Sequence, residues 1–184
     1  MTAPAGELVR LRARLPADIP VLDAELHDDV AIHVMSSYRP WRPYSPGAAA
    51  SPYAVAEPTP RSARFSVVTL DGDELAGEAT LWAIDSWHRS AHVGLALRAS
   101  CRGRGLGTDV VRVLCHYGFT VLGMHRLQVE TLATNQAMLR AAEQAGFRRE
   151  SVNREVGWVL GEFADEVVLG MLHREWADLR TPDG

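Results

Sequence analysis

The alternation of hydrophobic and polar residues begins with a predicted strand and a helix. Residues 7–15 alternate between the two classes and end at Pro16, a pattern typical of a short strand. Asp18 then stands at the N-cap position of a predicted helix that continues to about Asp28. The proline-rich segment 39–61 disfavours regular structure, so we expect a long irregular connection there.

A small sheet is predicted in the middle of the chain. Residues 64–70 and 75–85 are apolar, β-rich runs separated by Asp71-Gly72-Asp73-Glu74. Because Asp-Gly is a strong hairpin signal, we expect these runs to form two antiparallel strands. Residues 91–98 alternate again and predict a third strand.

The second half of the chain predicts two helices and three further strands. The elements are a helix from about Thr108, a strand at 125–132, a helix at 135–145 that ends at Gly146, and a hairpin of strands 149–160 and 163–172. Helices and strands in this order predict an α/β fold. A chain of 184 residues fits one domain, so we expect a single domain over residues 1–184.

Composition and charge exclude several classes of protein. Hydrophobic residues make up 47% and charged residues 23%, which is typical of a globular protein. No apolar run approaches the roughly 18 residues of a membrane span, and the first residues lack a charged-then-apolar leader. We therefore expect a cytoplasmic protein with no membrane partner. A net charge of −4 disfavours nucleic acid as a partner.

The small number of cysteines and the absence of lysine exclude further kinds of site. Only Cys101 and Cys115 occur, without a CxxC pair, so we expect neither a disulfide framework nor a metal site. All 19 basic residues are arginine. Without lysine, a P-loop and a lysine Schiff base are both excluded.

The densest chemical signal is the segment Arg102-Gly103-Arg104-Gly105-Leu106-Gly107, which lies between a predicted strand and a predicted helix. Alternating glycines let backbone N–H groups converge, and the helix adds the positive end of its dipole. The segment therefore predicts an anion site, with a tight turn that binds nothing as the alternative.

These residues resemble the coenzyme A loop of the GNAT N-acetyltransferases, Gln/Arg-x-x-Gly-x-Gly/Ala, which Arg102, Gly105 and Gly107 match. The resemblance covers roughly residues 7–176 and follows the pattern of the RimJ/RimL-like branch. Its other matches are Val93-Gly94-Leu95-Ala96-Leu97, Gly118-Phe119, His125-Arg126, Asn135, Gly146-Phe147, Asp165 and Arg174-Glu175-Trp176.

The resemblance implies an α/β fold of the α+β type: a mixed, mostly antiparallel sheet flanked by helices and splayed at the acyl-CoA site. Acetyl-CoA is then the co-substrate, its pantetheine arm extended along Leu95, Ala96 and Leu97 like an added strand. The diphosphate is expected on the amides of Gly103, Arg104, Gly105, Leu106, Gly107 and Thr108. Arg102 or Arg104 would reach the phosphates.

Asn135 matches the position whose side chain hydrogen-bonds the pantetheine arm, and it is also placed to N-cap the helix that begins at Gln136. Proton-handling residues are harder to identify. Met138, Ala142 and Gly157 occupy the positions where relatives carry a serine, a tyrosine and a glutamate.

Carboxylates on predicted strands are the substitutes we expect for the missing groups. Glu78 and Glu130 are the candidate catalytic residues, since a carboxylate with a raised pKa can act as a base through water. His92 lies beside the expected thioester strand and is a weaker candidate. Trp41, in the proline-rich segment, is the candidate substrate-binding residue, with simple packing as the alternative.

The sequence thus predicts an acetyl-CoA-dependent N-acetyltransferase. The acetyl group would pass by direct attack in a ternary complex to a primary amine, either a protein N-terminal α-amine or a small molecule. A non-catalytic acyl-CoA-binding module is the alternative, because the usual proton-handling groups are missing. The sequence does not indicate an oligomeric state.

Overall fold

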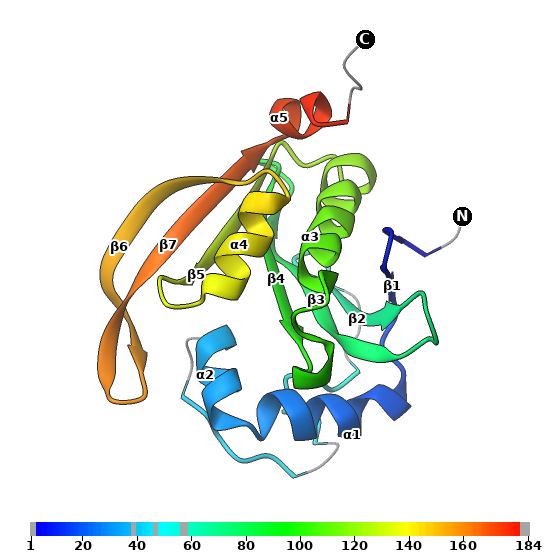
Figure 1. The fold of residues 1–184 in the computed structure, drawn as a ribbon, viewed down its shortest axis with the longest axis vertical. Helices are drawn as coiled ribbons and strands as arrows, with labels where there is room; N and C mark the ends of the chain where they lie inside the picture. Colours follow the sequence, from blue (N-terminus) through cyan, green and yellow to red (C-terminus); the bar gives the residue numbers. More distant parts are fainter. Residues whose placement is uncertain (1–2, 38–39, 46–47, 56–58, 181–184) are drawn as a thin grey trace.

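The computed structural model describes residues 3–37, 40–45, 48–55 and 59–180. Within these residues one seven-stranded sheet has the order β1-β2-β3-β4-β5-β7-β6 (Figure 1). The strands are β1 (Val9–Arg12), β2 (Ala63–Thr69), β3 (Leu75–Asp85), β4 (Ser90–Leu97), β5 (Arg126–Leu132), β6 (Arg148–Val159) and β7 (Glu162–Leu172). All neighbouring strands are antiparallel except β4 and β5. The sheet is therefore mixed and mostly antiparallel, as predicted.

Helices cover one face of this sheet and lie at both of its ends. They are α1 (Ile19–Leu22), preceded by a 3-10 turn at Pro16–Asp18 and followed by a π-helical turn at Asp23–His27, α2 (Val30–Ser37), α3 (Leu106–His116), α4 (Gln136–Gln144) and α5 (His173–Asp178). Figure 1 shows α3 and α4 in front of the sheet, and α1 and α2 at its lower end. In the described part of the chain, no helix is both long enough and apolar enough to cross a membrane.

Strand alternation gives the sheet two distinct faces. Leu81, Val93 and Leu127 point toward α3 and α4 and belong to the main core, where each is at most 3% exposed. The neighbouring positions, such as Ala96, point the other way, and Ala96 joins a smaller cluster with Leu22, Leu26 and Tyr53. We call this other side the second face of the sheet; it lies opposite α3 and α4.

The sheet opens between β4 and β5. These strands pair only where Ser90–His92 meets Arg126–Gln128, so His92 and Gln128 form the last pair of the ladder. Beyond it, Val93–Leu97 has a strand partner on the β3 side alone. The predicted splay is therefore confirmed, and one edge of β4 is free to bind an extended ligand.

A buried carboxylate anchors α3, the helix that the glycine-rich segment leads into. Asp109 accepts hydrogen bonds from the backbone amides of Glu7, Leu8 and Val9, at 3.1, 2.7 and 3.0 Å. Asp109 is 4% exposed, so these amides satisfy a carboxylate that would otherwise be costly to bury. The beginning of α3 is thereby held against β1.

Several expected boundaries are corrected by the structure. The first strand covers only Val9–Arg12, and α3 begins at Leu106 rather than near Thr108. Helix α2 was not predicted, although Asp29 caps it by accepting a hydrogen bond from the Ile32 amide at 3.0 Å. The other predicted strands, the helix after Asn135 and the last hairpin are confirmed.

The predicted irregular connection is confirmed where it is described. Residues 40–45, 48–55 and 59–61 hold no helix or sheet strand, apart from a single bridge at Thr59. Positions 39, 46–47 and 56–58 of the predicted segment lie outside the described residues.

Asp18 does not cap a helix in the way the sequence predicts, because its carboxylate is engaged elsewhere. It accepts hydrogen bonds from both terminal nitrogens of Arg12 at 2.6 and 2.8 Å, from the Leu15 amide at 2.8 Å and from the Ser66 hydroxyl at 2.7 Å. Burial alone would raise the pKa of Asp18, but these hydrogen bonds and the Arg12 charge outweigh it and lower the pKa to about 2. Asp18 therefore joins β1, β2 and the first helix.

Replacing Asp18 with asparagine should destabilise the fold at neutral pH. The unfolded carboxyl titrates near 4 and the folded one near 2, so its charge contributes about 2 kcal/mol above about pH 5 and less as the pH falls toward 2. Urea denaturation should show D18N less stable by this amount at pH 7 and by about half of it at pH 3. The exposed Asp178→Asn is the control, and a D18N difference that does not change with pH would contradict the interpretation.

Candidate functional site

A cleft of about 480 Å³ opens beside the free edge of β4, between the start of α3, α4 and α2. Helix α2 contributes Ile32 and Met35, and α4 contributes Met138 and Arg140. Nine residues that the sequence singled out for acyl-CoA binding also line the cleft: Leu95, Ala96, Leu97, Arg102, Gly103, Gly105, Gly107, Thr108 and Asn135. The α2 residues were not expected here, because that helix was not predicted from the sequence.

The glycine-rich segment turns the chain sharply into α3. Gly103 and Gly105 have φ values of +71° and +77°, in the left-handed region that glycine adopts without a Cβ penalty. Gly105 is the N-cap of α3. The first amides of a helix have no intrahelical acceptor, and the helix dipole is positive there, so this end of the cleft is suited to an anion.

Polar side chains support the two walls of the cleft. The Arg102 Nε donates a hydrogen bond to the Leu97 carbonyl at 3.0 Å, on the last residue of β4. Asn135 accepts a hydrogen bond from the Met138 amide at 3.2 Å, and its Nδ2 donates to Thr131 Oγ1 at 3.1 Å. The N-cap role of Asn135 is thus confirmed, whereas its contact with a pantetheine arm stays a prediction.

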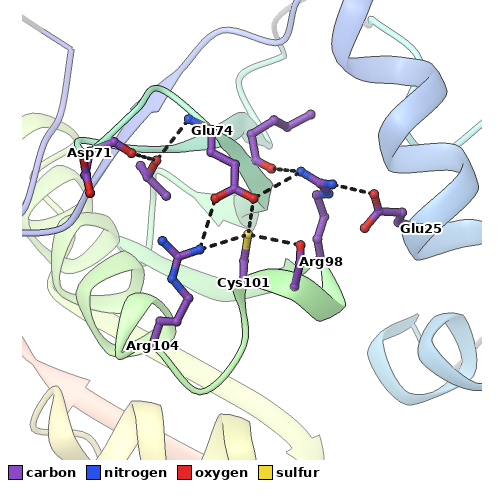
Figure 2. A network of polar contacts seen from close by, with 9 residues as sticks. Glu25, Asp71, Glu74, Arg98, Cys101 and Arg104 are labelled. Atoms are coloured by element: carbon purple, nitrogen blue, oxygen red, sulfur yellow. Dashed lines mark hydrogen bonds and ion pairs between the residues drawn. The ribbon is translucent and has the colours of Figure 1, made fainter.

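Arg104 and Leu106 do not line the cleft. Figure 2 shows Glu74 between Arg98 and Arg104, with the Cys101 thiol beside it. Glu74 accepts from Arg104 at 3.1 Å and from the thiol at 3.4 Å, and these contacts, that of Arg104 foremost, lower the pKa of Glu74. Arg104 is therefore paired away from the cleft, and the Leu106 side chain, 4% exposed, is buried in the core.

Glu78, one of the two expected catalytic residues, is held in an ion pair. It lies on β3, on the second face, and accepts a hydrogen bond from Arg14 at 2.6 Å. The Arg14 side chain is only 5% exposed and lies over the ring of Tyr53. Because the Arg14 guanidinium already occupies this carboxylate, the geometry disfavours Glu78 as a base.

Glu130, the other expected catalytic residue, lies beside His92. Its Oε2 is 3.6 Å from Nδ1 of His92. His92 forms the last residue pair between β4 and β5, with Gln128 as its partner. The Oε1 of Glu130 accepts a hydrogen bond from Gln128 Nε2 at 2.6 Å. The ring of His92 contacts that of Trp82, with centroids 4.4 Å apart. The sequence predicts His92 only as a weaker candidate, because nothing in it indicates the register between these strands.

The remaining expected residues lie elsewhere. Trp41 is packed on His27 and donates a hydrogen bond to its carbonyl at 2.9 Å, so it does not line the cleft. Met138 lines the cleft and Ala142 is fully buried. Neither side chain carries a titrating group. Among the described residues, no cluster of histidine, cysteine or acidic side chains is arranged to hold a metal ion.

The chain is similar in sequence to several N-acetyltransferases. It is 27% identical over 114 residues to an uncharacterized N-acetyltransferase of Bacillus licheniformis, covering 62% of this chain and 64% of the relative. It is 30% identical over 110 residues to the probable N-acetyltransferase YjcK of Bacillus subtilis, covering 59% and 61%. The matches thus span less than two thirds of these relatives. With spermidine N(1)-acetyltransferase of Escherichia coli K12 it shares 27% identity over 123 residues, 66% of each chain.

Solved structures share the fold over more of the chain. A probable acetyltransferase superimposes with a TM-score of 0.80 at 22% identity, covering 96% of this chain and 99% of the other. Spermidine N-acetyltransferase from Vibrio cholerae, in complex with CoA and spermine, gives a TM-score of 0.75 at 18% identity, covering 92% and 98%. The acetyltransferase (GNAT) domain profile matches residues 9–148, which include the splayed strands and the glycine-rich segment, and the chain therefore belongs to the GNAT acetyltransferase family.

Proposed function

We propose that this chain is an acetyl-CoA-dependent N-acetyltransferase that transfers the acetyl group to a primary amine by direct attack in a ternary complex. The observation that carries the proposal is the cleft at the free edge of β4, with the glycine-rich segment at its end. A free strand edge suits the extended pantetheine arm, and a helix N-terminus suits its phosphates. Family membership supports the same activity.

Acetyl-CoA would lie with its pantetheine arm along Leu95–Leu97 and its diphosphate on the amides of Gly103–Thr108. Arg102, exposed at the cleft, would contact the phosphates, and Asn135 would contact the arm. Arg104 would join them only after exchanging Glu74 for a phosphate oxygen. In this orientation the thioester points toward His92, the closed end of the gap between β4 and β5.

The acceptor that we propose is a small amine with a second positive charge. Glu130 and Glu166 both lie on the second face, and within the described residues neither forms an ion pair with an arginine. Trp82, 42% exposed on the same face, offers a ring to an alkylammonium group. The names of two relatives, a spermidine acetyltransferase and one solved with spermine, support a polyamine.

A protein N-terminal α-amine is the other candidate acceptor, and membership in the RimJ/RimL-like branch stays a prediction. About a third of an α-amine is neutral at pH 7.5, against about a thousandth of a lysine side chain. This difference favours the α-amine over lysine as a nucleophile before any contact is formed.

A non-catalytic acyl-CoA-binding module is the second candidate function. It is favoured by Met138 and Ala142, which replace the serine and tyrosine expected from relatives. Release of free thiol from acetyl-CoA, dependent on an added amine, distinguishes an enzyme from such a module.

Substituting Gly105 should weaken coenzyme A binding strongly without unfolding the chain. A valine at φ +77° is strained, so the backbone that presents the amides to the phosphates would have to change its conformation. Isothermal titration calorimetry should show the affinity of G105V for CoA reduced by about 100-fold or more. Gly161→Val, at φ +97° in the distant β6–β7 turn, is the matched control, and equal affinity for G105V and wild type would contradict the assignment.

Polyamines should be better acceptors than monoamines of similar length. An ammonium group paired with a partly buried carboxylate contributes about 1.5–3 kcal/mol, so kcat/KM for spermidine should exceed that for butylamine by about 10-fold to 100-fold. Steady-state assays should include a peptide with a free α-amine and a blocked lysine. Equal kcat/KM values for spermidine and butylamine would contradict the charge argument. Faster acetylation of the peptide would instead favour an α-amine acceptor.

A further inference from the structure

We infer that His92 is the catalytic base that takes the proton from the acceptor amine, and that Glu130 is the positioning residue that holds its ring. This inference rests on the proposed function and deepens it, because it assigns the proton transfer that the missing family residues leave open. Its basis is the position of the two side chains at the closed end of the gap between β4 and β5.

The strand register places His92 where an acetyl group would arrive. His92 belongs to the last residue pair between β4 and β5, and the free edge of β4 begins with the next residue, Val93. At about 3.3 Å per residue, His92 lies about 16 Å along β4 from Leu97, at the opposite end from the glycine-rich segment. An extended arm whose phosphates lie at that segment therefore directs its thioester toward His92.

The two ring nitrogens of His92 have different surroundings. Nδ1 is buried and makes no hydrogen bond to any described residue, and a Glu130 carboxylate oxygen is 3.6 Å away. This separation is about 0.4 Å beyond the upper limit of a normal N–H···O hydrogen bond, so a small movement of the ring would complete the bond. A proton on Nδ1, shared with Glu130, leaves Nε2 with the lone pair that accepts a proton from the substrate.

Glu130 is itself held in place by its own strand. Its other carboxylate oxygen accepts a hydrogen bond from Gln128, whose Oε1 accepts one from Arg126 at 3.0 Å. Arg126 also forms an ion pair with Glu150 on β6. Both His92 and Glu130 retain 24% exposure of their side chains, so they are supported by packing and still accessible from solvent.

The charged groups around His92 are few among the described residues. From β5, Glu130 faces it directly, with Arg126 beyond Gln128. From β3 its ring contacts Trp82, which carries no charge, and the next carboxylate along that strand face is Glu78, already paired with Arg14. Among the described residues, Glu130 is therefore the one carboxylate that acts on the imidazole at short range.

The proposed step balances without another reactant. His92 Nε2 takes one proton from the alkylammonium, and the freed nitrogen lone pair forms the C–N bond to the thioester carbonyl carbon. The C–S bond then breaks and its electron pair leaves with sulfur. The proton that the nitrogen loses on becoming an amide goes to the thiolate, and imidazolium returns its proton to solvent.

The test compares full-length H92Q, E130Q and wild type in acetyl transfer from acetyl-CoA to spermidine between pH 5.5 and 9.5. His88→Gln, a substitution of an exposed histidine in the β3–β4 turn, is the matched control. H92Q should lose about 100-fold or more in kcat/KM while its affinity for CoA and its thermal stability stay at wild-type values. Added imidazole should restore part of the rate to H92G.

E130Q should show a smaller loss of rate together with a displaced pH profile. The neutral amide places no negative charge beside Nδ1, so the acid limb of kcat/KM should move to lower pH. Full activity in H92Q, or an acid limb that stays in place in E130Q, would overturn the inference while leaving the acetyltransferase function intact. Failure of the wild-type protein to acetylate any amine would instead refute the proposed function.

Discussion

The short parallel pairing between β4 and β5 is the constraint on which the rest of the site depends. Only three residue pairs join the strands, and the last is His92 with Gln128. Past this point β4 keeps its antiparallel partner β3, so it stays extended while its other edge is free. The same geometry opens the cleft on one side of the gap and brings His92 to Glu130 at its closed end.

Other contacts hold in place the elements that surround the gap between β4 and β5. Asp109 holds the start of α3 against β1, which positions the glycine-rich segment at the end of β4. Arg98 links the turn after α1 to the β3 segment, since it donates to Glu25 at 2.6 Å and to the Leu75 carbonyl at 2.6 Å. Figure 2 shows that this arginine and Arg104 share Glu74. The turn that precedes α2 and the glycine-rich segment are thereby tied to the same part of the sheet.

On the second face, arginines pair with Glu78 and Glu150, whereas within the described residues Glu130 has no arginine partner. Arg14 neutralises Glu78, and Arg126 pairs with Glu150. Glu130, between these pairs, has histidine and glutamine as its neighbours in the described part of the chain. A carboxylate in such surroundings attracts cationic groups, so the proposed cationic acceptor and the proposed histidine base rest on the same arrangement.

Local patterns in the sequence were sufficient for most of the fold. The Asp-Gly hairpin, the turn that the glycine-rich segment makes into α3 and the cap at Asn135 are each determined by residues close together in the chain, and each is confirmed. Anion binding at the glycine-rich segment stays a prediction. The pairing of His92 with Glu130 and of Arg14 with Glu78 depends on strand register and on contacts between residues 38 and 64 positions apart, which alternation does not specify. Asp18 was misassigned for the same reason, because Ser66 and Arg12 compete for its carboxylate. Helix α2 was not predicted, although Asp29 is placed to cap it.

A crystal structure with coenzyme A tests the central claim most directly. The account predicts the diphosphate on the amides of Gly103–Thr108, the pantetheine arm along the free edge of β4, and the sulfur at the closed end of the gap, near His92. Coenzyme A bound outside this gap, or with its sulfur directed away from His92, would contradict it.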